Sequence, residues 1–474
     1  MTLPSIASAT RTRPSEYTVL AVTAAAVFMS FLDVTIVNIA FGSIRADFGT
    51  ASLSLVSWVV NGYGVAFAAA LLPAGALSDR LGHRTVFVAG VALFGAASLV
   101  AGLSGSVAVL IAARVAQALG AAALVPSAQA ALLTATPVHH RGRALAVLGS
   151  TGAVAAAAGP ALGGVLIGSV GWPAVFLVNV PVAVVVAIAA RRLLPRPTPS
   201  RAAGAGDGTL TTLAAVGVAA VALALVQAPD WGLTDPRTAG SLVAGLLLVG
   251  VLVLRARRHA SDGALVPLFA LRSFRVANLG SFVFATAFYP LLLANALFLT
   301  TELDYDITTA GIALTPGALM AALTAVIGGR AVDRAGARSV AVTGGVLLAA
   351  GCTVLALRAP GGVYVTDILG GVLLTGTGIG LSLTALTTAA VSEVPAPRFG
   401  VASATTACLR QIGGVLGIAA LIAMLAGLGP RPATYSLAWG AMAVSAVLAA
   451  ACGAALAHRT PSPVTTSTRE RAAT

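Results

Sequence analysis

Apolar runs of about twenty residues recur along the whole chain, each long enough to cross the ~30 Å hydrocarbon core of a bilayer. Within a bilayer every backbone amide needs a partner in the chain itself, so such unbroken runs predict helices. Only 9% of the 474 residues are charged, whereas a soluble domain carries roughly 25%. The predicted fold class is therefore an all-α polytopic membrane protein.

The net charge of +13 is carried by arginine, because all 28 basic residues are arginine. In a soluble protein this excess would suggest nucleic acid. Here the arginines fall mostly at the termini and in alternate short loops, which the positive-inside rule explains without a nucleic-acid partner. We therefore expect both termini in the cytoplasm and the protein in the cytoplasmic membrane. The three cysteines lie singly in apolar segments, so neither a metal site nor a disulfide framework is expected.

The apolar segments and the loops between them predict fourteen transmembrane helices with both termini on the same side. The expected organisation is a cytoplasmic N-terminus (1–16), an N-terminal six-helix half (17–194), a linker rich in Pro and Gly (195–208), inserted helices 7 and 8 (209–255), a cytoplasmic or interfacial loop (256–275), a C-terminal six-helix half (276–457) and a cytoplasmic tail (458–474).

An internal repeat supports the division into two halves. The stretch GALSDRLGHR follows the second predicted helix, and GRAVDRAGAR follows the tenth, 254 residues later. The shared positions are Gly75, Asp79, Arg80, Gly82 and Arg84 in the first copy, and Gly329, Asp333, Arg334, Gly336 and Arg338 in the second. An aspartate here can cap a helix and pair with an arginine. We expect these residues to form a cytoplasmic gate, with solvated turn charges as the alternative.

Several motifs carry a resemblance to a known family. They are LDVTIVNIA from Leu32 to Ala40, the helix-4 set Arg114, Gln117 and Gly120, the helix-5 set Gly159, Pro160, Gly163 and Gly164, the stretch GWPAVFLVNVP from Gly171 to Pro181, and RQIGG from Arg410 to Gly414. Together they resemble the fourteen-helix drug:proton antiporter branch of the major facilitator superfamily. The sequence departs from that pattern at Gly42, where proline is usual, at Ala118, where glycine is usual, at His83, where arginine or lysine is commoner, and at Pro173 and Ala174, where an Arg-Trp pair is usual.

The resemblance implies a transporter and not an enzyme. It implies two halves that rock about a central site and export a hydrophobic or amphiphilic drug-like molecule against inward proton flow. No cofactor is implied beyond the proton gradient, and we expect the chain to function as a monomer. The arginine-only, Ala- and Gly-rich composition resembles that of actinobacterial antibiotic-resistance exporters.

Asp33 lies in the middle of an otherwise apolar run. A carboxylate at the bilayer centre costs about 2.5–3.5 kcal/mol on insertion scales, so it needs a partner or a function. Counting residues from the helix ends sets Asp33 and Arg114 at similar depth, roughly 10–12 Å from the outer face. We expect the two to interact, directly or through water, and Asp33 to carry the proton. The alternatives are a permanently neutral or paired Asp33 and a purely structural Arg114.

The two halves differ in chemistry, because the position equivalent to Asp33 in the second half is Ala287. The ninth predicted helix is instead apolar and aromatic. We expect Asn38, Phe284, Phe288 and Tyr289 to line the substrate cavity, with core packing as an equal alternative for the aromatic residues. Two other functions stay open: a proton-coupled importer or facilitator of a metabolite, and a sensor or scaffold that keeps the transporter fold.

Overall fold

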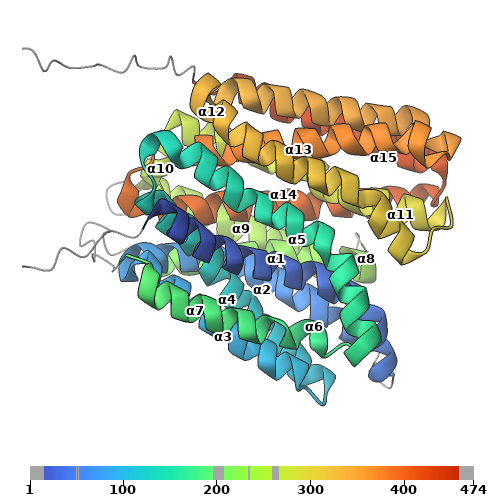
Figure 1. Cartoon of the computed structure of the whole chain (residues 1–474), viewed down its shortest axis with the longest axis horizontal. Helices are drawn as coiled ribbons and strands as arrows, with labels where there is room; N and C mark the ends of the chain where they lie inside the picture. The colour runs from blue at the N-terminus through green and yellow to red at the C-terminus, as the bar shows by residue number, and fades with distance from the viewer. Residues whose placement is uncertain are drawn as a thin grey trace, which may run out of the picture.

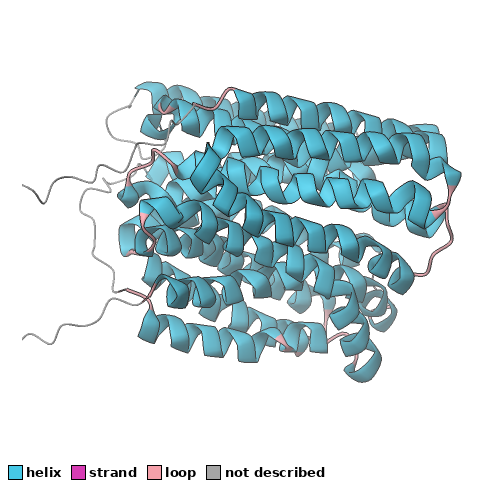
Figure 2. Cartoon of the chain, turned by 45° about the horizontal axis from the view of Figure 1, so that its top comes forward, coloured by secondary structure: helices cyan, strands magenta, loops and turns pink. Residues whose placement is uncertain are grey.

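The computed structural model describes residues 15–49, 51, 53–195, 208–232, 235–258 and 266–457. Within these ranges the chain is helical and contains no strand, and the helices run side by side along the long axis of the molecule (Figure 2). The α-helices are α1 (Glu16–Asp47), α2 (Leu53–Leu81), α3 (His83–Gly102), α4 (Val107–Ala135), α5 (Arg141–Val170), α6 (Ala174–Leu177), α7 (Asn179–Leu193), α8 (Gly208–Trp231), α9 (Pro236–Arg258), α10 (Val266–Ala270), α11 (Arg272–Thr301), α12 (Ile307–Arg358), α13 (Leu369–Val391), α14 (Phe399–Leu428) and α15 (Pro432–Ala454). Short 3-10 turns span Val138–His140, Ala359–Gly361 and Ala396–Arg398, and a π turn spans Tyr364–Ile368.

Every apolar segment predicted from the sequence lies on a helix, and ten of the described helices are long and apolar enough to cross a membrane. The second copy of the repeated motif, which follows the tenth predicted helix, lies within the single element α12, and this element is interrupted only at Gly336 with φ 82° and ψ 156°. The last helix of the N-terminal half is divided into α6 and α7. Pro181 explains this division, because it offers no amide hydrogen to the turn before it.

The helices form two groups. In Figure 1 α1–α7 (blue to green) occupy one side of the molecule and α11–α15 (yellow to red) the other. Where the groups meet, α5 packs along α12, and α14 packs along α2 and α4. In the inserted pair, α8 packs on α9, on α2 and on α14.

Small residues set how closely the helices approach. A Cβ added to Gly120 of α4 would lie 2.7 Å from the backbone nitrogen of Phe94, and one added to Gly90 of α3 would lie 2.8 Å from that of Leu124. These distances are too short for any side chain, so α3 and α4 cross backbone to backbone. Close contact through glycine is the usual way in which membrane helices gain packing energy.

Candidate functional site

Asp33 lies at the centre of a buried polar cluster in the N-terminal group. The residue is 1% exposed, and its carboxylate accepts three hydrogen bonds, two from α4 and one from the first residue of α7. Arg114 Nη1 donates to Oδ2 at 2.5 Å, Gln117 Nε2 donates to Oδ1 at 2.8 Å, and Asn179 Nδ2 donates to Oδ1 at 2.9 Å. The predicted interaction between Asp33 and Arg114 is therefore a direct ion pair in this structure.

Arg114 is buried, with 2% of its surface exposed, and the described residues around it contact both its polar atoms and its guanidinium face. Its Nε donates to the Val59 carbonyl at 3.0 Å, and Nη1 also donates to Gln117 Oε1 at 2.7 Å. The guanidinium carbon lies 4.3 Å from the centroid of the Tyr63 ring and 5.8 Å from that of Phe176. Such contacts stabilise a desolvated cation.

A chain of hydrogen bonds fixes the orientation of the Gln117 amide. Gln117 Nε2 donates to Ser98 Oγ at 2.8 Å, and Ser98 Oγ donates to the Phe94 carbonyl at 2.8 Å. Gly120, one turn beyond Gln117, allows the close α3–α4 crossing that brings Ser98 into reach. The helix-4 motif thus supplies two donors to the carboxylate, Arg114 and Gln117, and Gly120 supplies the close approach to α3, which carries Ser98.

The hydrogen bonds to Asp33 fit an ionised carboxylate. Arg114, Gln117 and Asn179 all donate to it, and a carboxylate accepts bonds without donating any. Two of the donors belong to α4 and one to α7, so the Asp33 side chain joins α1 to both of these helices.

The helix-5 glycines differ in what they contact. A Cβ on Gly159 would overlap the side chain of Thr35, two residues after Asp33, so α1 and α5 touch directly at this level. A Cβ on Gly163 would make ordinary contacts of 3.7 Å, and one on Gly164 would meet nothing within 4 Å. Gly159 is thus the position where a side chain is excluded. The Pro160 side chain lies outside the described part of the structure.

Asp79, from the first copy of the repeated motif, joins the two groups of helices. Its Oδ1 accepts from the Gly400 amide at 2.7 Å and its Oδ2 from the Val401 amide at 2.8 Å. These are among the amides that the first turn of α14 cannot satisfy within the helix, so a carboxylate is favoured there by both hydrogen bonding and the helix dipole. A Cβ on Gly75 would lie 2.5 Å from that of Ala404, which keeps α2 and α14 in contact.

The second copy of the motif makes the reciprocal contact. A Cβ added to Gly142, the second residue of α5, would overlap Asp333 Oδ1. Gly82 and Gly336 occupy equivalent positions and both have positive φ, 89° and 82°, a conformation that favours glycine. The copies differ in burial: Asp79 is 8% exposed, whereas Asp333 is exposed.

The arginines of the repeat lie at the edge of this contact. Arg80, Arg334 and Arg338 are exposed, and Arg84 donates to the Arg191 carbonyl at the end of α7. Asp79 is thus bonded to the N-terminus of α14, whereas Arg80, Arg334 and Arg338 lie at the surface.

The first residues of α5 and α14 also touch each other. The Arg141 guanidinium carbon lies 5.0 Å from the centroid of the Phe399 ring. Phe399 is 1% exposed and belongs to an apolar cluster that includes Leu133, Leu145 and Val401, drawn from both groups of helices. This cluster and the two aspartate contacts close the same end of the interface. The sequence analysis did not identify Arg141 or Phe399, because their contact depends on the first turn of α5 lying beside the first turn of α14.

The predicted cavity residues do not form one surface. Phe284 is fully buried in the core of the C-terminal group and stacks on Phe288 with centroids 5.4 Å apart. Phe284 therefore has the core position that the sequence analysis gave as the alternative to the cavity. Tyr289 is half-buried and packs on Gly414, where an added Cβ would lie 2.4 Å from the nearest ring carbon. The Asn38 side chain lies outside the described part of the structure.

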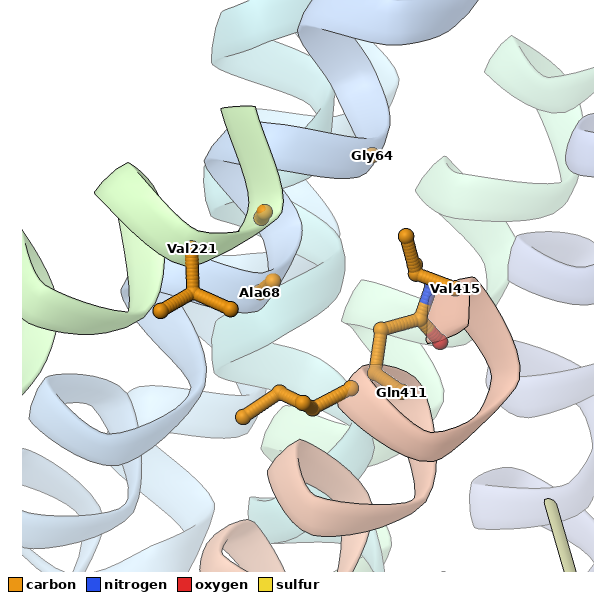
Figure 3. Close-up of a pocket in the computed structure, with 7 residues that line it drawn as sticks. Gly64, Ala68, Val221, Gln411 and Val415 are labelled. Atoms are coloured by element: carbon orange, nitrogen blue, oxygen red, sulfur yellow. The ribbon is translucent and has the colours of Figure 1, made fainter. Parts of the chain in front are cut away.

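A small cavity of about 70 Å³ lies where α2, α8 and α14 meet (Figure 3). Its wall is almost wholly apolar, and the residues that line it are Gly64, Ala68, Val221, Ala222, Gln411, Ile412 and Val415. Asn61 Nδ2 donates to Gln227 Oε1 at 3.3 Å and links α2 to α8 on the same side of the molecule. The described ranges hold no group of three His, Cys, Asp or Glu side chains that could bind a metal ion.

Comparison with known proteins places this geometry in a family context. The sequence matches the profile of the Major Facilitator Superfamily over residues 23–274 and 277–474. It is 34% identical to a tetracenomycin C resistance and export protein of Streptomyces glaucescens, over 89% of this chain and 77% of that protein. It is 34% identical to a cephamycin export protein of Amycolatopsis lactamdurans, over 89% and 88%, and 33% identical to a puromycin resistance protein of Streptomyces alboniger, over 86% and 81%.

Solved structures share the fold. The human organic anion transporter TETRAN aligns with a TM-score of 0.66 and 16% identity, over 92% of this chain and 100% of that chain. A proton:xylose symporter aligns with a TM-score of 0.65 and 15% identity, over 91% and 94%. At these identities the likeness concerns the arrangement of helices alone.

Proposed function

Because the chain belongs to the major facilitator superfamily, a family of membrane transporters and not enzymes, we propose that it is a proton-coupled antiporter. It exports a hydrophobic or amphiphilic, antibiotic-like small molecule. The names of its relatives, which export tetracenomycin C and cephamycin, support the direction and the class of compound. The buried Asp33, held by three donors inside the membrane, is the observation that carries the proton coupling.

The proposed topology has fourteen transmembrane helices, with both termini in the cytoplasm, in the cytoplasmic membrane. The excess of arginine in the loops assigned to the cytoplasm supports this orientation. It sets Asp79, Asp333, Arg141 and Phe399 at the cytoplasmic end, where they act as the gate. The chain then works as a monomer by alternating access, with the central site between the halves. The proton gradient is the energy source, and no cofactor takes part.

In the proposed cycle, Asp33 exchanges its bond with Arg114 for a proton in one access state and restores it in the other. Arginine keeps its charge under all physiological conditions, so the proton resides on Asp33. Gln117 and Asn179 hold the carboxylate while Arg114 withdraws. In this cycle the release of Arg114 from the carboxylate couples proton uptake to a movement of α1 against α4.

Inside-out vesicles with an acid interior test this function. A pH-sensitive dye reports the gradient while tetracenomycin C, puromycin and other lipophilic antibiotics are added to the wild type and to Asp33→Asn. We expect compound-dependent loss of the gradient in the wild type and none in the variant. Gln227→Leu, which removes a buried amide that bonds to Asn61 and not to Asp33, is the control for general damage.

Three outcomes would contradict parts of the proposal. Equal responses in the wild type and in Asp33→Asn would leave antiport in place and remove Asp33 from the proton path. Accumulation of compound inside energised whole cells, in place of depletion, would indicate import. Absence of any ion-coupled flux with every compound would argue against a transporter of this substrate class.

A further inference from the structure

Arg410 differs from the other intramembrane arginine. It lies on α14, roughly 16 Å along the axis from Phe399 and thus near mid-membrane. Among the residues that the structure describes, nothing forms a hydrogen bond, ion pair or ring contact with its guanidinium. Arg114, in contrast, has Asp33, Gln117, a carbonyl and an aromatic ring. An arginine at this depth costs about 2.5–3.5 kcal/mol, so a bare one requires a compensating ligand or function.

Arg410 also lies where α14 changes from fully buried to partly exposed. Every residue of α14 from Phe399 to Cys408 is buried, and the residues from Leu409 to Ile412 are half-buried. Arg410 therefore lies just beyond the buried stretch of α14, at a position where its side chain is partly exposed. Along one side of a helix, positions three or four residues apart are neighbours. Arg410 consequently shares a face with Gly414 and Gly417.

That face meets α11. Gly414 packs on the ring of Tyr289, and a Cβ on Gly417 would lie 2.9 Å from Pro290. The neighbouring residue Gln411 contributes to the small apolar cavity at the α2–α8–α14 junction. Arg410 thus offers a positive charge beside an aromatic and apolar surface, with an amide one residue away.

The charge balance indicates what such a site binds. Asp33 and Arg114 neutralise each other in the structure. Arg410 has no carboxylate within ion-pair distance among the residues that the structure describes, and a solute with a negative charge would compensate its charge. A planar guanidinium fits carboxylate and similar oxygen pairs with two parallel hydrogen bonds.

From these observations we propose that Arg410 binds an acidic oxygen group, a carboxylate or phenolate, on an aromatic or otherwise apolar compound. This inference rests on the proposed export of drug-like molecules and specifies their chemical class. The acidic group lies against Arg410, and the apolar body lies along the α11–α14 face near Tyr289. Compounds with the same ring system and no acidic group bind more weakly at this position.

A matched pair of ligands tests the proposal. Binding of pyrenebutyric acid and of its methyl ester is measured on the purified protein in nanodiscs, with empty nanodiscs as the correction for lipid partition. A charge-assisted hydrogen-bond pair is worth about ten- to a hundredfold in affinity. We expect the wild type to prefer the acid by that factor and Arg410→Gln to lose the preference with little change for the ester. Arg410→Lys should retain part of the preference for the acid, because an ammonium group keeps the charge but cannot form the bidentate hydrogen bond of a guanidinium.

Arg358→Gln is the control, because it removes one exposed arginine from the end of α12 and keeps the same total charge as Arg410→Gln. A preference for the acid that persists in Arg410→Gln would overturn the proposal. So would equal binding of acid and ester, or binding of neither, in the wild type. The same measurement on Asp33→Asn separates this inference from the proposed function: loss of proton coupling with a retained preference for the acid would count against Asp33 alone.

Discussion

Asp79→Asn should weaken the closure between α2 and α14. In the structure the carboxylate accepts one hydrogen bond at each oxygen, both from the first turn of α14. Charge-assisted bonds are worth about 1.5–3 kcal/mol each, whereas an asparagine has one acceptor oxygen and forms a neutral bond of about 1 kcal/mol. At the lower limit the change costs about 2 kcal/mol, roughly thirtyfold in the ratio of closed to open protein.

Spin-label distances can measure this ratio. Labels at Leu81→Cys and Ala335→Cys report the separation of the two groups at the gate, because both positions are exposed and lie beside the two motif copies. The three natural cysteines are first replaced by alanine. We expect a second, longer distance to gain population in Asp79→Asn, and thermal unfolding to show that the protein remains folded.

The repeat provides the control for this experiment. Asp333→Asn removes the equivalent charge, but Asp333 is exposed and water screens its interactions, so a shift below about threefold is expected. Equal shifts from the two variants, or an unchanged distance distribution in Asp79→Asn, would refute the argument from buried hydrogen bonds.

Three further perturbations follow from the same geometry. Arg114→Gln leaves Asp33 buried without its cation and should destabilise the protein by about 3–5 kcal/mol. Asp33→Asn in the same chain should restore much of the lost melting temperature. Losses of melting temperature that add in the double variant would contradict the pairing. Gly159→Val should lower the melting temperature and abolish transport, because a side chain there overlaps a threonine of α1, and an unaffected variant would show that α1 and α5 can separate freely. Arg141→Met and Phe399→Leu should each favour the open gate by about 1 kcal/mol, and the double variant should add little to either, as spin-label distances would report.

The sequence predicted the helical segments and the repeat because both depend on local patterns. Hydrophobic length fixes a membrane helix with little help from the rest of the chain, and two copies of one turn motif align without knowledge of packing. The depth of Asp33 and Arg114 also followed from counting residues along two helices. Their direct contact could not be derived in that way, because equal depth does not determine which faces the helices present.

The partners of Asp33 show where sequence reasoning ended. Asn179 lies 146 residues away and reaches the carboxylate only because α7 packs beside α1. A polar amide in an apolar stretch was a visible signal, but it did not indicate a target. Phe284 shows a different limit: an aromatic residue in a membrane helix packs equally well in a core or beside a cavity, and the sequence left both open. In α11 it packs in the core.

The pairing of Asp33 with Arg114 has an electrical consequence. The intact ion pair carries no net charge, so the membrane potential exerts little force on it. In the proposed cycle Asp33 binds a proton, Arg114 alone then determines the charge of the cluster, and a potential that is negative inside draws the protonated cluster toward the cytoplasm. A full crossing of the field corresponds to about 2.3 kcal/mol per 100 mV. The proposed antiport would therefore still have a driving force in a cell with a strong potential and almost no pH difference.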